Sequence, residues 1–194
     1  MGHDTVLLVR HGRTAFNAER RFLGVTDVGL DPVGRVQARE LSWHPLVLRA
    51  DRVVSSPLRR ARQTATLLRG PHTVHPGLAE LDQGRLEGLD PATAFARHPA
   101  FFRAWVVDPE SACVPGGEAL GAARDRGVSA FADLVDAAGE GGPLVLVSHG
   151  LLLAALCTAL EGAPLTTWRQ HVLPHGGTRT LRWRRGRWTA DGLR

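Results

Sequence analysis

Lysine is absent from this sequence, so arginine supplies all 24 of its basic side chains. The absence excludes a P-loop nucleotide site, because that motif needs a lysine to reach the β- and γ-phosphates. Arginine titrates at very high pH, which places the pI near 11.0 although the formal net charge is only +5. This basic excess suits an anionic substrate. No basic stretch is interleaved with aromatics in the manner of nucleic-acid recognition modules, so we expect no nucleic-acid partner.

Cysteine is scarce as well, since only Cys113 and Cys157 occur. Two cysteines, one of them inside an apolar helical pattern, do not make a disulfide framework, and we expect both to be reduced thiols.

Apolar runs stay short of the length that spans a membrane, and no signal-peptide h-region precedes the first apolar segment. These features predict a cytoplasmic protein with no membrane partner.

Several catalytic motifs are missing too. The chain has no Gly-x-Ser-x-Gly elbow, and no arginine follows Cys113 at the spacing that a cysteine-dependent phosphatase loop needs. His72 and His75 lack further ligands at a metal-binding spacing. These absences predict a reaction that uses neither a metal nor another cofactor. Histidines in loops or beside prolines are expected to be solvated, namely His3, His44, His72, His75 and His98.

What the sequence does contain is a regular alternation of strand and helix patterns. Short apolar runs that end abruptly in polar residues predict buried parallel strands at 6–9, 52–56 and 144–147. An edge strand is expected at 73–75, and a C-terminal hairpin at 178–189. For 194 residues this order predicts one α/β domain, residues 1–194, built as a three-layer αβα sandwich around a mainly parallel central sheet.

Helices are expected between these strands. Asp31-Pro32 caps the first of them, whose apolar positions are Val33, Val36, Leu41 and Trp43. The other helices are expected at about 57–68, at 91–108 with a break at His98-Pro99, at 120–138 and at 151–160.

The first strand ends on Arg10-His11-Gly12. In open α/β sheets the loops at the carboxyl ends of the strands bind the ligand, so this edge receives a fixed cation and an imidazole. The arginine favours an anion and biases the imidazole toward its neutral, nucleophilic form. Taken alone, the tripeptide is equally compatible with a strand end that carries solvated polar residues.

Two more strands end in a similar way. The strand at 144–147 leads into Ser148-His149-Gly150, and the strand at 52–56 leads into a helix with Arg59, Arg60 and Arg62. Because all three ends share one edge of a parallel sheet, two imidazoles and at least two guanidiniums can converge there. Gly150 also begins a helix, whose N–H groups favour an anion. A phosphoryl group is the ligand that fits this cluster best, and segment 78–88 offers carboxylates as proton donors.

Four motifs in this order resemble those of the histidine phosphatase superfamily, also called the phosphoglycerate mutase-like family. They extend over most of the chain and are Leu8–Gly12 with Thr14 and Asn17, Ser55–Ala65, Leu78–Gly88, and Val147–Gly150. The resemblance implies a phosphoglycerate mutase-like fold and a metal-independent, histidine acid phosphatase-like phosphomonoesterase.

The same resemblance implies roles for the matched residues. His11 is the nucleophile that forms a phosphohistidine, and Glu80 protonates the leaving oxygen and then activates water. The other matched residues hold the phosphoryl group or contact the substrate, and they are Arg10, Asn17, Gly24, Arg60, His149 and Gly150.

Position within the motifs selects among neighbouring residues of the same type. Arg60 directly precedes the motif alanine, which leaves Arg59 and Arg62 as a solvated helix face. Glu80 is preferred to Asp82 for the same reason, and Glu87 is expected to be structural.

The family contains mutases, which return the phosphoryl group to the substrate, and phosphatases, which transfer it to water. Here Leu81 follows Glu80 where the mutases have arginine, and residues 101–118 replace the mutases' arginine pair and proline-rich run. Both features favour a phosphatase that acts on a small phosphorylated metabolite, as a monomer or homodimer. Two alternatives stay open: phosphoglycerate mutase-type transfer, and a non-catalytic module that binds a phospho-ligand.

Arg13, Leu23 and Ala119 depart from the family pattern without removing a catalytic group.

The apolar side of segment 91–108 is expected to cap the site, which favours a small or partly apolar leaving group. His171 and His175 are candidates for the pocket rim. The apolar positions of segment 91–108 are Phe95, Phe101, Phe102, Trp105 and Val106.

Overall fold

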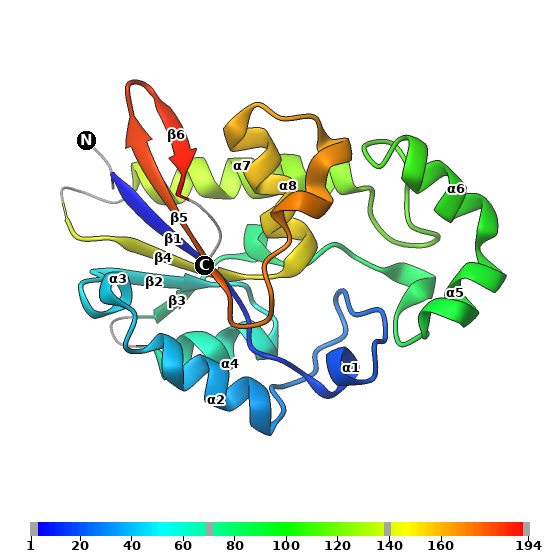
Figure 1. Ribbon diagram of the computed structural model, residues 1–194, viewed down its shortest axis with the longest axis horizontal. Helices are drawn as coiled ribbons and strands as arrows, with labels where there is room; N and C mark the ends of the chain where they lie inside the picture. Colours follow the sequence, from blue (N-terminus) through cyan, green and yellow to red (C-terminus); the bar gives the residue numbers. More distant parts are fainter. Residues whose placement is uncertain (1–3, 69–71, 138–140, 192–194) are drawn as a thin grey trace.

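A six-stranded sheet runs through the middle of the structure in the order β3-β2-β4-β1-β5-β6 (Figure 1). The structure is a computed structural model, and it describes residues 4–68, 72–137 and 141–191. Strands β1, β2, β3 and β4 are parallel, whereas β5 pairs with β1 and β6 pairs with β5 in antiparallel fashion. The strands are β1 (Thr5–Arg10), β2 (Arg52–Ser55), β3 (His72–Val74), β4 (Leu144–Ser148), β5 (Thr178–Arg184) and β6 (Arg187–Ala190).

Helices cover both faces of this sheet, as Figure 1 shows. One face carries α2 (Pro32–Leu41), α3 (Pro45–Leu48) and α4 (Arg59–Leu67), and the other carries α7 (Leu120–Asp136) and α8 (Gly150–Glu161). The predicted three-layer αβα sandwich with a mainly parallel sheet is therefore confirmed. The remaining elements are α1 (Ala15–Ala18), α5 (Pro91–Arg97), α6 (Pro99–Val107) and the 3-10 helices η1 (Pro76–Leu78), η2 (Gly84–Leu86) and η3 (Leu165–His171).

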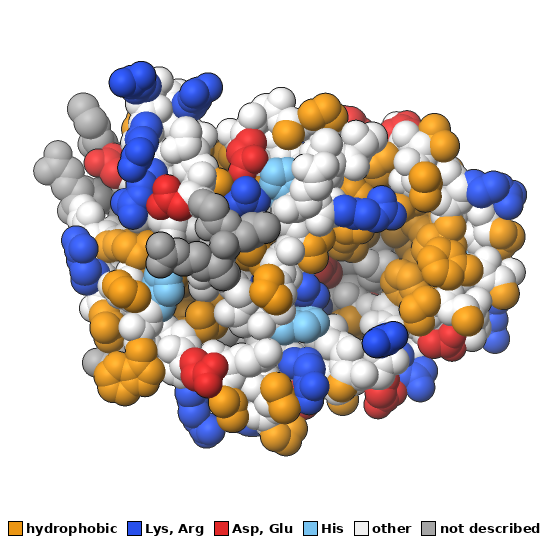
Figure 2. Space-filling view, viewed as in Figure 1, with side chains coloured by type: hydrophobic (Ala, Val, Ile, Leu, Met, Phe, Trp, Pro, Cys, Tyr) orange, Lys and Arg blue, Asp and Glu red, His pale blue; other side chains and the backbone are white. Residues whose placement is uncertain are grey.

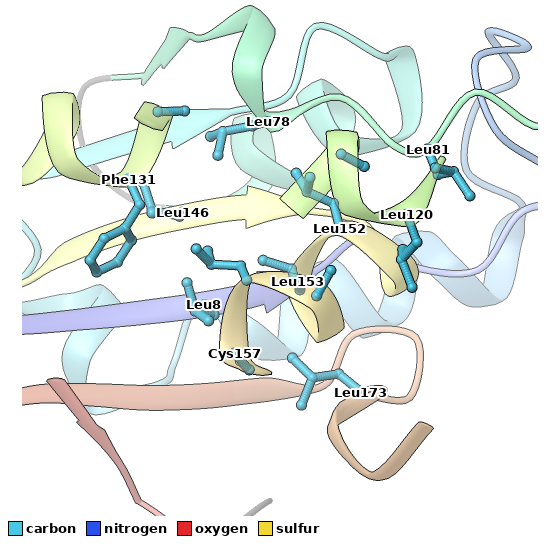
Figure 3. Packing of buried hydrophobic residues seen from close by; sticks show 14 of the residues in the cluster. Leu8, Leu78, Leu81, Leu120, Phe131, Leu146, Leu152, Leu153, Cys157 and Leu173 are labelled. Carbon is cyan, nitrogen blue, oxygen red and sulfur yellow. The ribbon is translucent and has the colours of Figure 1, made fainter. Parts of the chain in front are cut away.

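The strands divide the apolar core between the two faces because successive side chains point in opposite directions. Leu7 and Val9 of β1 pack in the cluster on the α2–α4 side. Val6 and Leu8 belong to the larger cluster on the α7–α8 side, to which α8 contributes Leu152, Leu153 and Cys157 (Figure 3). Each fully buried aliphatic side chain stabilises the fold by about 2 kcal/mol relative to an exposed one, so this two-sided core fixes the sheet register.

Helix α2 differs from the prediction. Val33 and Val36 are 44% and 50% exposed, and Trp43, 68% exposed, lies beyond the end of the helix. Of the predicted positions Leu41 is buried, and the other buried residues of the helix are Gly34 and Ala38. The reason is a close approach between backbones, since a Cβ at Gly34 would lie 2.0 Å from the carbonyl oxygen of Arg13. Small residues face the protein there because they alone leave room for the loop after β1.

Helix α4 begins at Arg59, two residues later than the sequence predicts, with Leu58 as its N-cap. Its inward face consists of Arg60, Ala61, Thr64 and Ala65. A fully buried arginine on this face is the first sign that the helix serves a polar site.

Helices α5 and α6 project from the right-hand side of the sandwich in Figure 1. They break at His98-Pro99 as predicted, because proline cannot donate a backbone hydrogen bond inside a helix. Trp105 is buried, but Phe95 and Val106 are exposed, so the predicted apolar side is only partly covered. These two helices pack on one another at a distance from the sheet, and some of their apolar residues face outward.

Within the part of the chain that the structure describes, no single helix is long and apolar enough to cross a membrane. By length and composition alone, α8 and η3 meet that criterion as a pair, with a bend of 117° between them.

The close approach at α2 gives a stability prediction. Gly34→Ala should lower the free energy of unfolding by roughly 1–3 kcal/mol, because the added methyl meets rigid backbone atoms. The gain in helix propensity, about 1 kcal/mol at most, is too small to offset this clash. Urea unfolding measures the difference, and Val36→Ala on the exposed face of the same helix should stay within about 0.5 kcal/mol of wild type. Equal or greater stability of Gly34→Ala would contradict the packing described.

Candidate active site

The carboxyl ends of β1, β2 and β4 meet at one edge of the sheet and bring the predicted polar residues together. Backbone pairing continues one residue past the strands, since the His11 N–H donates to Ser148 O at 3.0 Å and the Ser56 N–H to Val147 O at 2.9 Å. The rings of His11 and His149 consequently lie 5.0 Å apart, centroid to centroid. The parallel register predicted from the sequence therefore places both imidazoles side by side.

His11 is held in one tautomer by the backbone. Its Nδ1 lies 2.7 Å from the carbonyl oxygen of Gly12, and because a carbonyl can only accept, Nδ1 carries the proton. The neutral ring then has its lone pair on Nε2. Burial, reinforced by the charges of Arg60 and Arg10, lowers the pKa of His11 well below its ordinary value. At neutral pH the side chain is thus an uncharged imidazole with a nucleophilic Nε2.

His149 is oriented by Ser56. Its Nε2 lies 2.7 Å from Ser56 Oγ, which also accepts a hydrogen bond from the Leu58 N–H. The Nδ1 atom of His149 is buried and has no hydrogen-bond partner among the described residues. Burial and the charge of Arg60 lower the pKa of His149 well below its ordinary value. His149 is therefore a neutral imidazole held in place through Nε2, with Nδ1 unpartnered.

Arg60 is fully buried beside His11, with its Nε 3.3 Å from His11 Nε2. Its two terminal nitrogens donate to Gly24 O at 2.6 Å and to Thr26 O at 3.0 Å. Burial lowers the pKa of Arg60 to about 10, opposed by the nearby carboxylate of Glu80, so the guanidinium stays charged at neutral pH. It is a fixed positive charge next to the nucleophile.

Arg10 is the second guanidinium at this edge. It donates from Nη1 to Leu173 O at 2.5 Å, and its Nη2 lies 3.4 Å from His175 Nε2. Its Nε is buried and has no partner among the described residues. Burial lowers the pKa of Arg10, and Glu80 opposes this.

The loop after η3 completes the pocket. The His175 ring lies 5.6 Å from that of His11, and the Gly176 N–H bonds the carbonyls of both Arg10 and His11. Burial, with the charge of Arg10, lowers the pKa of His175 to about 4. From the sequence, His175 was only a candidate for the pocket rim. The residues next to it do not indicate that this loop packs against the end of β1. His171 lies elsewhere, paired with Arg179.

Glu80 occupies the N-terminus of α8. One carboxylate oxygen accepts from the N–H groups of Leu81 and Leu152 at 3.0 Å each, and the other accepts from Leu151 at 3.2 Å. We expected this helix end to bind the substrate anion, but the Glu80 carboxylate accepts hydrogen bonds from its N–H groups in the structure. Gly150 contributes instead by lacking a side chain, because a Cβ there would lie 3.0 Å from the Arg10 guanidinium carbon.

Asn17 and Gly24 lie on the loops around this cluster. Asn17 Oδ1 accepts from the backbone N–H and the hydroxyl of Thr14, which leaves the amide NH2 as its free donor. The two backbone groups of Gly24 are engaged with Glu87 and Arg60. Asn17 is therefore placed to contact a ligand, whereas Gly24 acts on Arg60.

Other predicted assignments can be located as well. Glu87 accepts from the Gly24 and Val25 N–H groups and is structural, and Arg59 and Arg62 are exposed. His72 is not freely solvated: it lies in β3, with Nε2 2.7 Å from Ser55 Oγ. His44 and His75 accept from backbone N–H groups at helix N-caps and, like His98, are half-buried. His3 falls outside the described residues.

The loop that carries Glu80 is braced by Arg126 of α7. Its guanidinium donates to the carbonyls of Gly77 and Ala79 at 3.0 Å and pairs with Glu118 at 2.9 Å. No sequence pattern predicts this role of Arg126, because its partners include backbone carbonyls of residues that are distant in the chain.

A cavity of about 270 Å³ opens beside the cluster. Polar residues line one part of it, and apolar side chains, the aromatic residues of α6 among them, line the rest; the polar lining is Arg10, Asn17, Arg21, Glu80, Gln83 and Gly150. In Figure 2 a hollow separates the body of the molecule from the α5–α6 segment. Among the described residues no group of three or more His, Cys, Asp or Glu side chains is arranged to hold a metal ion.

Comparisons with known proteins give a consistent result. The profile of the histidine phosphatase superfamily (branch 1) matches residues 6–194. A probable phosphoglycerate mutase of Enterobacter sp. (strain 638) is 31% identical over 191 residues, which are 96% of this chain and 88% of that protein. The solved structure of a mycobacterial glucosyl-3-phosphoglycerate phosphatase is 31% identical, with a TM-score of 0.86 and 97% of each chain covered. A structure from Thermus thermophilus is 33% identical, with a TM-score of 0.74 and coverage of 97% of this chain and 98% of that one.

The lowered pKa values give a prediction about acid stability. Histidine side chains in the unfolded chain have a pKa of about 6.5. Because the pKa values of His11, His149 and His175 are lower in the folded protein, the unfolded state binds more protons below this pH. The free energy of unfolding should therefore fall as the pH is lowered from about 6.5 to 5. Denaturant unfolding at several pH values measures the slope. His175→Gln removes one titrating group and should give a shallower slope, and an unchanged slope would contradict the assignment.

Proposed function

The chain belongs to the histidine phosphatase superfamily, and on that basis we propose that it hydrolyses phosphomonoesters through a phosphohistidine on His11. Phosphatase activity as such is supported by the family and by the solved phosphatase relatives. One observation carries the mechanism: the lone pair of His11 Nε2, which accepts a hydrogen bond from Arg60 Nε at 3.3 Å, lies in a cluster with two guanidiniums and the His149 ring, and Arg10 and Glu80 of this cluster line the adjoining cavity.

In the first step His11 Nε2 attacks phosphorus, and the bond from phosphorus to the ester oxygen breaks. Arg10, Arg60 and His149 hold the phosphoryl oxygens and stabilise the charge that develops on them. Glu80 donates a proton to the leaving oxygen, which departs as the alcohol. In the second step water loses a proton to Glu80 and attacks phosphorus, which releases inorganic phosphate and restores His11.

A phosphoglycerate mutase-type transfer is the second candidate. It is favoured by the similarity to probable phosphoglycerate mutases. A coupled assay for interconversion of 3- and 2-phosphoglycerate distinguishes the two, because a mutase gives interconversion without net release of phosphate.

His11→Ala should lower phosphate release from p-nitrophenyl phosphate by roughly 10³-fold or more, because no other nucleophile occupies this position. Arg62→Ala, at an exposed position of α4, serves as the control and should keep wild-type activity. Wild type is assayed with and without EDTA, and equal rates are expected because the proposed chemistry needs no metal; inhibition by EDTA would contradict that part of the proposal. Trapping with labelled substrate should give an acid-labile, base-stable phosphoenzyme in wild type. Substantial activity of His11→Ala would overturn the mechanism.

Glu80→Gln should have an effect that depends on the leaving group. A primary alkoxide needs a proton as it departs, so hydrolysis of alkyl phosphates should fall by roughly 10²–10⁴-fold. Nitrophenolate is stable without a proton, so formation of the phosphoenzyme from p-nitrophenyl phosphate should be slowed much less. Pre-steady-state measurement of nitrophenol release tests this directly. An equal loss for both substrates would show that Glu80 does not act as the acid.

A further inference from the structure

The cavity beside the phosphate-binding residues has an aromatic wall. Phe101 packs against both Phe102 and Trp105, with centroid distances of 5.0 and 5.4 Å, and the Trp168 ring lies 6.2 Å from that of Trp105. Phe22 joins this wall through Phe102 at 5.9 Å. All of these residues line the cavity, and Figure 2 shows hydrophobic side chains crowded on its α5–α6 side.

Aliphatic side chains fill the spaces between the rings, namely those of Leu23, Leu86, Leu151 and Val172. The Trp168 Nε1 atom is buried and has no hydrogen-bond partner among the described residues. The part of the cavity that would hold the leaving group is thus apolar over most of its surface.

Charged groups that could hold an acidic leaving group are few. Among the described residues that line the cavity, the cations are Arg10 and Arg21. Arg10 belongs to the phosphate cluster. Arg21 is already engaged, since its Nε pairs with Glu19 at 2.6 Å and its Nη1 donates to Gly88 O at 2.8 Å. Apart from these two arginines, the cavity offers a carboxylate only the neutral amides of Asn17 and Gln83, so an acidic alcohol would lose its hydration without gaining a cation of its own.

We propose that the physiological substrate is the phosphomonoester of a compact aromatic alcohol, and that Leu23 and the aromatic wall determine this specificity. The inference rests on the phosphatase function proposed above. The volume of about 270 Å³ lies just below the roughly 300 Å³ at which pockets for small molecules start, so it favours a compact leaving group. The ring system lies against Phe101, Trp105 and Trp168, while the phosphoryl group reaches His11 past Arg10.

The test compares phosphates of three primary alcohols, which make the same demand for a proton on the leaving oxygen. They are 2-naphthylethyl phosphate, glycerol 3-phosphate and 3-phosphoglycerate. We expect kcat/KM for the naphthyl ester to exceed that of the other two by roughly 10- to 100-fold, as burial of apolar area predicts. The difference should lie mainly in KM, because the reacting groups are the same.

Leu23→Gln tests the specificity directly, because Leu23 is half-buried in the cavity wall and a polar replacement disturbs no core packing. It should lower kcat/KM for the naphthyl ester about tenfold and leave glycerol 3-phosphate within about twofold of wild type. Phe101→Leu, which removes one ring but keeps an apolar side chain, should act in the same direction. Leu48→Gln, an equal change at an exposed position outside the cavity, is the matched control and should alter neither substrate.

The outcomes separate this inference from the function on which it rests. Hydrolysis of 3-phosphoglycerate or glycerol 3-phosphate as fast as the naphthyl ester overturns the aromatic specificity and leaves the phosphatase proposal intact. A naphthyl preference that Leu23→Gln and Phe101→Leu do not change overturns the assignment to this cavity. Failure to hydrolyse any of these esters or p-nitrophenyl phosphate overturns the phosphatase function itself.

Discussion

Positive charge buried at one edge of the sheet is the constraint on which the rest of the site depends. Arg60 is fully buried and Arg10 is partly buried, yet carbonyls that fix them, those of Gly24, Thr26 and Leu173, are neutral. Carbonyls satisfy the donors but do not neutralise the charge, and desolvation lowers the pKa of both arginines. The loops at 22–27 and 173–177 therefore follow their particular paths to bring carbonyls to these cations, and a phosphoryl anion would supply the missing counter-charge.

Neutral imidazoles are the second half of this arrangement. Burial, reinforced by the same guanidiniums, keeps His11 and His149 uncharged, so both imidazoles are neutral while the site remains cationic. The Gly12 carbonyl then determines which nitrogen of His11 carries the proton, and Ser56 orients the His149 ring. The charge and orientation of both imidazoles therefore depend on neighbouring residues, and the parallel pairing of the strands brings those neighbours together.

The strand ends were predictable because an apolar run that stops at Arg10-His11 or Ser148-His149 is a local signal, and parallel pairing then brings these ends together. Contacts made through the backbone were not predictable. The carbonyl of Leu173 carries no side-chain signature, and the capture of the α8 N-terminus by Glu80 joins segments 71 residues apart in the chain. The buried face of α2 was wrongly assigned because hydrophobicity selects Val33, whereas the backbone approach selects Gly34.

The two projecting helices have an evolutionary consequence. The polar cluster of His11, Arg60 and His149 lies on the sheet edge and its adjoining loops, whereas α6 supplies Phe101, Phe102 and Trp105 to the cavity from a segment that leaves the sandwich and returns to it. Phe101 and Phe102 are only partly buried, unlike Trp105, so substitutions at these two positions can accumulate with little effect on the sheet register or the buried cations. A lineage with this architecture can therefore exchange one alcohol for another by drift in a peripheral hairpin of helices, while the phosphorus chemistry is inherited unchanged.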